Sequence, residues 1–92
     1  MTSILSAEKR CFICGTTQNL HRHHIYHGAN RKISERWGCW VYLCYAHHNG
    51  SNMGVHFNSE LDRELQCRCQ EAWEAQFGSR EDFRKTFGRS FL

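Results

Sequence analysis

The sequence lacks the long apolar runs that membrane proteins carry. No segment approaches the roughly 20 consecutive apolar residues that a membrane-spanning helix needs. Residues 1–10 also lack the apolar stretch of a secretory signal. We therefore expect a protein of the reducing cytoplasm.

Proline, internal repeats, low-complexity tracts and linkers are absent as well. The 92 residues are enough for one domain, so we expect a single domain over residues 1–92. A domain of this size has a small hydrophobic core. Small domains commonly gain stability from a bound metal ion or from disulfides.

Cysteine, in contrast, is abundant, with six residues in this short chain. In a secreted domain an even number of cysteines would indicate a disulfide framework. Here no secretory signal supports export, and Cys11 and Cys14 form a Cys-x-x-Cys pair. In a cytosolic chain such a pair is more often a metal site or a redox site.

Charge is unevenly distributed along the chain, whose net charge is +3. Residues 1–56 carry six basic and two acidic side chains, and residues 57–92 carry six basic and seven acidic ones. All seven histidines lie between His21 and His56. A basic, histidine-rich half is compatible with a polyanionic partner, and a solvated surface of mixed charge is the alternative.

The pattern of apolar and turn-forming residues predicts an α+β fold. Residues 1–9 read as a loose arm and residues 10–15 as a tight turn of the zinc-knuckle type. Strands are expected at residues 19–26 and 40–43, a short helix or ordered loop at 30–37, a turn or helix at 44–48, and a loop at 49–54.

Two helices are expected in the last third of the chain. Apolar residues recur at helical spacing in the first of them: Leu61, Leu65, Ala72, Trp73 and Phe77. Asn58 or Ser59 can cap its start, and Gly78 can end it in the left-handed conformation. Ser79, followed by acidic residues, starts the second helix, which Gly88 ends.

Two ligand pairs predict a structural zinc site. Cys11-x-x-Cys14 and Cys44-x-x-His47 each span a tight turn, so that both side chains of a pair can reach one ion. A complete tetrahedral Cys3His shell suits zinc and leaves no open position for chemistry. Buried free cysteines and a redox Cys-x-x-Cys pair are the alternatives. The remaining cysteines are expected in the core or on the surface: Cys39, Cys67 and Cys69.

The histidine cluster indicates catalytic chemistry. His23 and His24 are adjacent near the end of an expected strand. One such imidazole can bind a metal ion while the other takes a proton from water. A lone histidine is usually structural, but this cluster is framed by cysteines at metal-ligand spacing.

Taken in order along the chain, these motifs resemble the HNH, or ββα-metal, nuclease superfamily, and in particular small phage and prophage HNH proteins. The resemblance covers roughly residues 11–60. It rests on Cys11-x-x-Cys14, on His23-His24-Ile25, on the stretch from Gly28 to Glu35, on Leu43-Cys44-x-x-His47-His48-Asn49, and on His56. It implies a small zinc-stapled, treble-clef-like ββα-metal domain, with a motif core at about residues 10–60 and a helical tail at 58–88.

The resemblance also implies a role for four of the histidines. His24 corresponds to the general base, and His23, His48 and His56 correspond to ligands of a catalytic divalent cation. Imidazole ligands favour manganese, nickel or zinc, and the resemblance adds magnesium. His27 is a possible stand-in ligand, and the remaining histidine, His21, is expected to be structural.

Three features depart from the superfamily pattern. The last zinc ligand is commonly cysteine, whereas here it is His47. His48 and His56 are eight residues apart instead of four, so a loop must bring His56 back to the ion. The middle asparagine, which constrains the loop and orients the base, has no clear counterpart, and Asn30 and Asn49 are the alternatives.

The expected activity is hydrolysis of DNA, with RNA as the alternative polymer. Four basic residues flank the histidine cluster and are expected to contact phosphates: Arg22, Arg31, Lys32 and Arg36. One such site cuts one strand, so double-strand cleavage would need a homodimer or two successive events. The resemblance to phage proteins suggests DNA packaging or recombination partners in a bacterial host cell.

A different class of function is a non-catalytic Cys3His zinc module that binds nucleic acid or protein. This interpretation keeps the zinc site but gives no role to His23, His24, His48 and His56. The number of bound ions separates the two classes. Two ion sites per chain favour the nuclease, and one favours the binding module.

Overall fold

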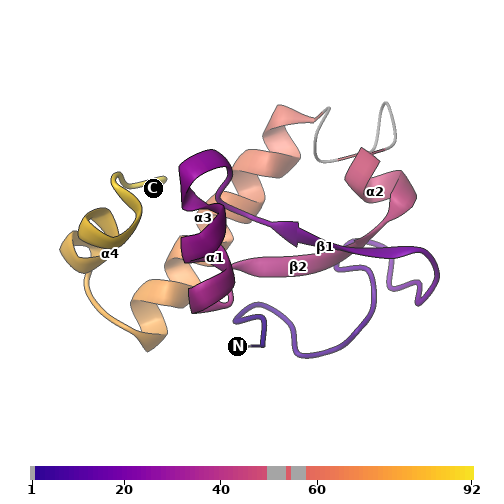
Figure 1. Cartoon of the computed structure of the whole chain (residues 1–92), viewed down its shortest axis with the longest axis horizontal. Coiled ribbons are helices and arrows are strands. Elements are labelled where there is room, and N and C mark those ends of the chain that lie inside the picture. Colours follow the sequence, from indigo (N-terminus) through magenta and orange to yellow (C-terminus); the bar gives the residue numbers. More distant parts are fainter. Residues whose placement is uncertain (1, 50–53, 55–57) are drawn as a thin grey trace.

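The computed structural model describes residues 2–49, 54 and 58–92 (Figure 1). The described part is a small α+β fold, as the sequence predicts. Its elements are β1 (Leu20–His24), the 3-10 turn η1 (Gly28–Asn30), α1 (Arg31–Trp37), β2 (Trp40–Cys44), α2 (Tyr45–Asn49), α3 (Ser59–Gln76) and α4 (Arg80–Phe87). In Figure 1, α4 lies at one end of the molecule and α2 at the other.

The two expected strands form one antiparallel pair. Leu20 lies opposite Cys44 and His24 opposite Trp40. Because successive residues of a strand point to opposite faces, His23 shares a face with its partner Val41, and His24 shares the other face with Trp40. The two adjacent histidines therefore leave the strand in opposite directions.

The short helix α1 connects the strands, so the alternative of an ordered loop is wrong. Gly38 ends α1 in the left-handed conformation, with φ of 72°. The Ser34 hydroxyl accepts a hydrogen bond from Tyr26 N and donates one to Tyr26 O, over 3.1 and 3.0 Å. Cys39 N donates to Ser34 O as well. These bonds fix α1 against both the end of β1 and the start of β2.

The long helix α3 begins at a capped end, as its sequence predicts. The Asn58 side chain accepts a hydrogen bond from Leu61 N, so Asn58 is the cap and Ser59 is the first helical residue. Leu65 and Trp73 of the apolar stripe are buried. The prediction of a left-handed Gly78 is wrong, because the left-handed glycines of the described chain are elsewhere.

The last helix, α4, starts with a reciprocal capping box and ends at a left-handed Gly88. The expected start and stop of this helix are thus confirmed. An added Cβ at Gly78 would lie 2.8 Å from Asp82 Oδ2. Gly78 therefore provides room for the capping carboxylate instead of ending α3.

An aromatic cluster joins the C-terminal segments to the loop after β1. The Tyr26 ring lies at its centre, with centroid distances of 5.5 Å to Phe83, 4.7 Å to Phe87 and 4.7 Å to Phe91. The Tyr26 hydroxyl donates to Gln66 O of α3 over 2.7 Å. The cluster thereby holds the loop after β1 against α3.

The N-terminal arm is docked, so the expectation of a loose arm is wrong. Ile4 N donates to Gly38 O over 2.9 Å. Ser3 is buried, and Ile4 and Leu5 pack against the core. Within the described residues, no helix is long and apolar enough to cross a membrane.

Gly38→Ala is expected to destabilise the fold more than Gly88→Ala. Both substitutions place a side chain at a positive φ, which costs about 1–3 kcal/mol. At Gly38 the added Cβ would also collide with Thr2 O, whereas at Gly88 it meets nothing within 4 Å. Chemical denaturation of both variants measures the difference, and equal losses would show that the arm does not dock at Gly38.

Candidate functional site

A short turn places Cys11 and Cys14 beside the end of β2. Cys11 N donates to Thr16 O and Gly15 N donates to Cys11 O, both over 2.8 Å. Gly15 adopts a φ of 79°, which allows the tight reversal. Phe12 N donates to Tyr42 O of β2, which anchors the turn on the strand.

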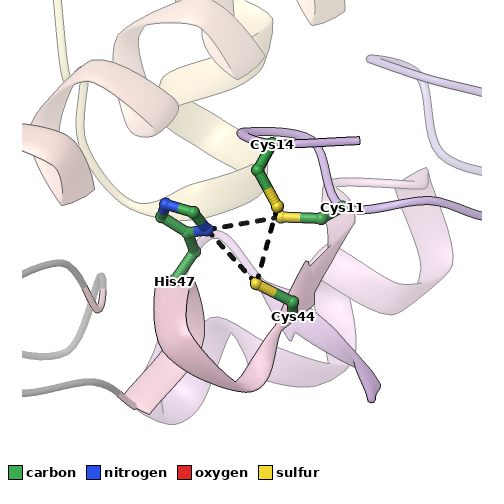
Figure 2. A group of neighbouring side chains, drawn as sticks. All are labelled: Cys11, Cys14, Cys44 and His47. Atoms are coloured by element: carbon green, nitrogen blue, oxygen red, sulfur yellow. Dashed lines mark hydrogen bonds between the residues drawn. The ribbon is translucent and has the colours of Figure 1, made fainter. Parts of the chain in front are cut away.

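The four predicted zinc ligands meet at this point (Figure 2). Cys14 Sγ lies 3.8 Å from Cys44 Sγ, and His47 Nδ1 lies 3.8 Å from Cys11 Sγ and 3.2 Å from Cys44 Sγ. A tetrahedral ion at the usual zinc–sulfur length would hold two sulfurs about 3.8 Å apart. The group could therefore hold a metal ion such as zinc, with His47 turned toward the sulfurs.

The surroundings of Cys11 favour the thiolate that a metal ion binds. Burial raises the pKa of this thiol, but backbone N–H groups of Cys14, Cys44 and Ile13 outweigh it and lower the pKa to about 6. At Cys14 the Thr16 N–H lowers the pKa, but partial loss of water around the thiol and the neighbouring thiols of Cys11 and Cys44 raise it overall. A cation would relieve this crowding of sulfurs.

The other three cysteines lie away from this group. Cys39 and Cys69 are fully buried. Cys67, on another side of α3, donates to Phe91 O over 3.2 Å. All three are in packing positions, as expected.

Next to the Cys3His group, a hollow of about 290 Å³ gathers the histidines of three elements. His24 and Arg22 come from β1, His27 and Arg31 from the loop after β1 and the start of α1, and His48 from α2. His23 lines it too, with its ring centroid 5.3 Å from those of both His27 and His48. The structure thus brings together three of the four histidines assigned by resemblance, and His56 lies outside the described residues.

A second metal-capable group lies at this hollow. His23, His27 and Asp62 each offer one ligand atom, and these atoms lie within 4.8 Å of one another. His27 Nε2 is 3.0 Å from Asp62 Oδ1, and this hydrogen bond raises the pKa of His27 against the opposing effect of burial. Two imidazoles and one carboxylate are suitable ligands for a divalent transition metal.

Asp62 had no sequence signal of a functional role. It lies in the first turn of α3, where an acidic residue is common because it complements the helix dipole. Only the packing of α3 against the loop after β1 brings this carboxylate to His27.

Glu35 is the last residue of the stretch on which the resemblance rests, but the motifs assign it no role. His24 Nε2 lies 3.0 Å from Glu35 Oε2, and Arg22 pairs with Glu35 Oε1. Burial raises the pKa of Glu35, but hydrogen bonds from His24 and Arg22 outweigh it and hold the pKa below its usual range. The Arg22 guanidinium also stacks over Trp40, 3.9 Å from the ring centroid.

The four expected phosphate contacts therefore differ in position. Arg31 lines the hollow and is exposed. Arg22 lines it as well, but its charge is paired with Glu35. Lys32 and Arg36 are exposed on α1 and do not line the hollow.

Neither of the two alternatives for the missing asparagine contacts His24. The Asn30 amide donates to Phe87 O over 2.9 Å, which ties η1 to the end of α4. The Asn49 amide lies 3.2 Å from His48 Nδ1. Asn30 is structural, and Asn49 contacts a predicted metal ligand instead of the predicted base.

No protein-family model, curated protein or solved structure matches this chain. The superfamily assignment therefore stays a prediction from the sequence motifs.

Cys14→Ser is expected to weaken zinc binding by more than about 100-fold. Loss of a residue that only hydrogen-bonds to a metal ligand already weakens metal binding by about 10–100-fold, and Cys14 would bind the ion directly. Cys14 is exposed, so the substitution leaves no cavity in the core. The substitution would therefore lower the stability of the fold only through loss of the bound ion. Zinc content and a competition titration with a chelator measure the change.

The matched control is Cys67→Ser, which is expected to keep one zinc ion per chain and a wild-type melting temperature within a few degrees. Equal zinc content in the two variants would contradict the Cys3His assignment.

Proposed function

We propose that this protein is a metal-dependent HNH endonuclease that hydrolyses phosphodiester bonds of DNA. The observation that carries the proposal is the hollow at the end of β1. There a candidate base, His24, lines the same space as two members of a metal-capable group, His23 and His27, beside a separate Cys3His group. A binding module needs the Cys3His group but not this second arrangement.

The donor set fits a divalent cation with open coordination positions. His23 and His48 are the predicted ligands at this hollow, and His27 and Asp62 add a second imidazole and a carboxylate beside His23. Fewer than six protein donors leave positions for water and for phosphate oxygens. Manganese, nickel and zinc suit these ligands best, and magnesium suits them less.

The residues at the hollow have separate roles in the proposed hydrolysis. His24 accepts a proton from the attacking water, since neutral imidazole is a base near physiological pH. Arg31, at the rim, binds a phosphate oxygen and positions the backbone, with Lys32 and Arg36 along the same helix. The cation, when bound, stabilises the negative charge that develops on the phosphate and the leaving 3′ oxygen.

The position of His23 supports a role as metal ligand rather than as base. Its side chain is almost completely buried, with 2% of its surface exposed, whereas His24 is partly exposed. A buried imidazole is poorly placed to take a proton from incoming water. The two neighbours on β1 therefore carry different roles.

His24→Ala is expected to lower the rate of plasmid nicking by about 10²–10⁴-fold, the usual contribution of a general base. The assay compares zinc-loaded proteins with added magnesium, manganese or nickel and without added cation. Wild type should cleave only with an added cation. Circular dichroism and zinc content confirm that the variant is folded.

The control is Glu71→Ala, which removes an exposed side chain of α3 that does not line the hollow. It should nick within about threefold of the wild-type rate, well short of the loss of a catalytic group. Absence of cleavage by wild type with every cation, together with one tightly held zinc ion per chain, would favour the non-catalytic zinc module.

A further inference from the structure

Within the described chain, the His24 ring makes a polar contact with Glu35, whose Oε2 lies 3.0 Å from Nε2. An ionised carboxylate has no proton to donate, so it can only accept a hydrogen bond. The ring nitrogen that faces it must therefore carry the proton. Nε2 of His24 is the donor, and in the neutral ring Nδ1 then holds the lone pair.

Both carboxylate oxygens of Glu35 are held. Oε2 faces His24, and Oε1 accepts from the Arg22 guanidinium, which stacks on Trp40. Glu35 follows Ser34, whose hydroxyl bonds the Tyr26 backbone on both sides. The carboxylate is thus fixed through its side chain and through its helix.

We propose that Glu35 is a positioning residue for His24: it accepts the Nε2–H hydrogen bond, fixes the ring orientation, and leaves Nδ1 as the proton acceptor. The proposal rests on the proposed role of His24 as the base. It assigns to Glu35 a function in the reaction that goes beyond its ion pair with Arg22.

The proton balance of the step is simple. Water gives one proton to Nδ1 of His24, and Nε2 keeps its own proton. The ring becomes a cation, and the hydroxide left from that water forms a bond to phosphorus. The P–O3′ bond breaks, and the leaving 3′ oxygen takes its electron pair and then a proton from solvent. The Glu35 carboxylate stays ionised and stabilises the new imidazolium charge, as an orienting carboxylate does in acyl-transfer triads.

An ordinary surface ion pair is the competing explanation. The Arg22 and Glu35 side chains are 39% and 46% exposed. Ion pairs with this degree of exposure contribute little to the stability of the fold. A carboxylate that orients a catalytic base contributes to the rate of the reaction instead. Loss of Glu35 should therefore change the reaction far more than the fold.

The first experiment observes the hydrogen bond without any cleavage assay. In zinc-loaded, nitrogen-15-labelled wild type at pH 8, the ring Nε2–H proton of His24 should give a signal protected from exchange with water. The signal is assigned by its absence in His24→Ala. It should disappear in Glu35→Ala and remain in the control variant Glu64→Ala.

Glu64 is a matched control because it also pairs with an arginine, Arg68 at 2.8 Å, on an exposed surface. It lies on α3 and does not line the histidine hollow. Its loss tests whether removal of any exposed glutamate–arginine pair has the same effect.

The second experiment measures the maximal nicking rate and the protein concentration that gives half of it. Glu35→Ala should lower the maximal rate by about 10–100-fold, the usual effect of losing an orienting partner, with a half-saturating concentration within about threefold of wild type. Glu35→Gln keeps an oxygen acceptor for Nε2–H, so it should recover part of the lost rate. Glu64→Ala should match wild type.

Each outcome decides the proposal separately from the nuclease function. If wild type nicks DNA but Glu35→Ala nicks at the wild-type rate, or the ring proton persists without Glu35, the positioning role is wrong. If wild type does not nick at all, the nuclease function fails, and the catalytic role of Glu35 fails with it. The ring-proton experiment then still establishes whether the hydrogen bond exists.

Discussion

The convergence of three sulfurs and one imidazole nitrogen at the end of β2 is the constraint on which the histidine hollow depends. Cys44 ends β2 and His47 follows within α2, so the group fixes how this helix leaves the strand. Neighbouring residues on a helix point about 100° apart. Once His47 faces the sulfurs, His48 must face elsewhere, and it lines the hollow beside His23.

The pairing of the two strands places the side chains of His23 and His24 on opposite faces of β1. His23 leaves β1 toward the side that contains His27, His48 and Asp62. His24 leaves it toward Glu35 of α1. A shift of the register by one residue would exchange these two neighbours and pair each with the wrong partners. The hydrogen bonds of Ser34 to Tyr26, which hold α1 to the end of β1, therefore matter for the site as well as for the fold.

Local patterns predicted the parts that depend on nearby residues. The two strands and the capped helices follow from short spacings. The meeting of Cys11 and Cys14 with Cys44 and His47 is a long-range contact, and it was predicted from the tetrahedral ligand set that zinc needs. Gly78 was misjudged because its conformation depends on Asp82 in the next helix. Two site residues could not be predicted, because they reach the histidines through tertiary packing: Asp62 resembles a helix-capping acid, and Glu35 lies in a helix of ordinary composition.

Titration of the zinc-loaded protein with paramagnetic manganese, followed by NMR, tests most directly whether the histidine hollow holds a second cation. The account predicts that substoichiometric manganese broadens the signals of His23, His27, His48 and Asp62 more strongly than those of Cys11 and Cys14. Broadening confined to the Cys3His group, or no selective broadening at all, would contradict a separate cation site and with it the proposed nuclease.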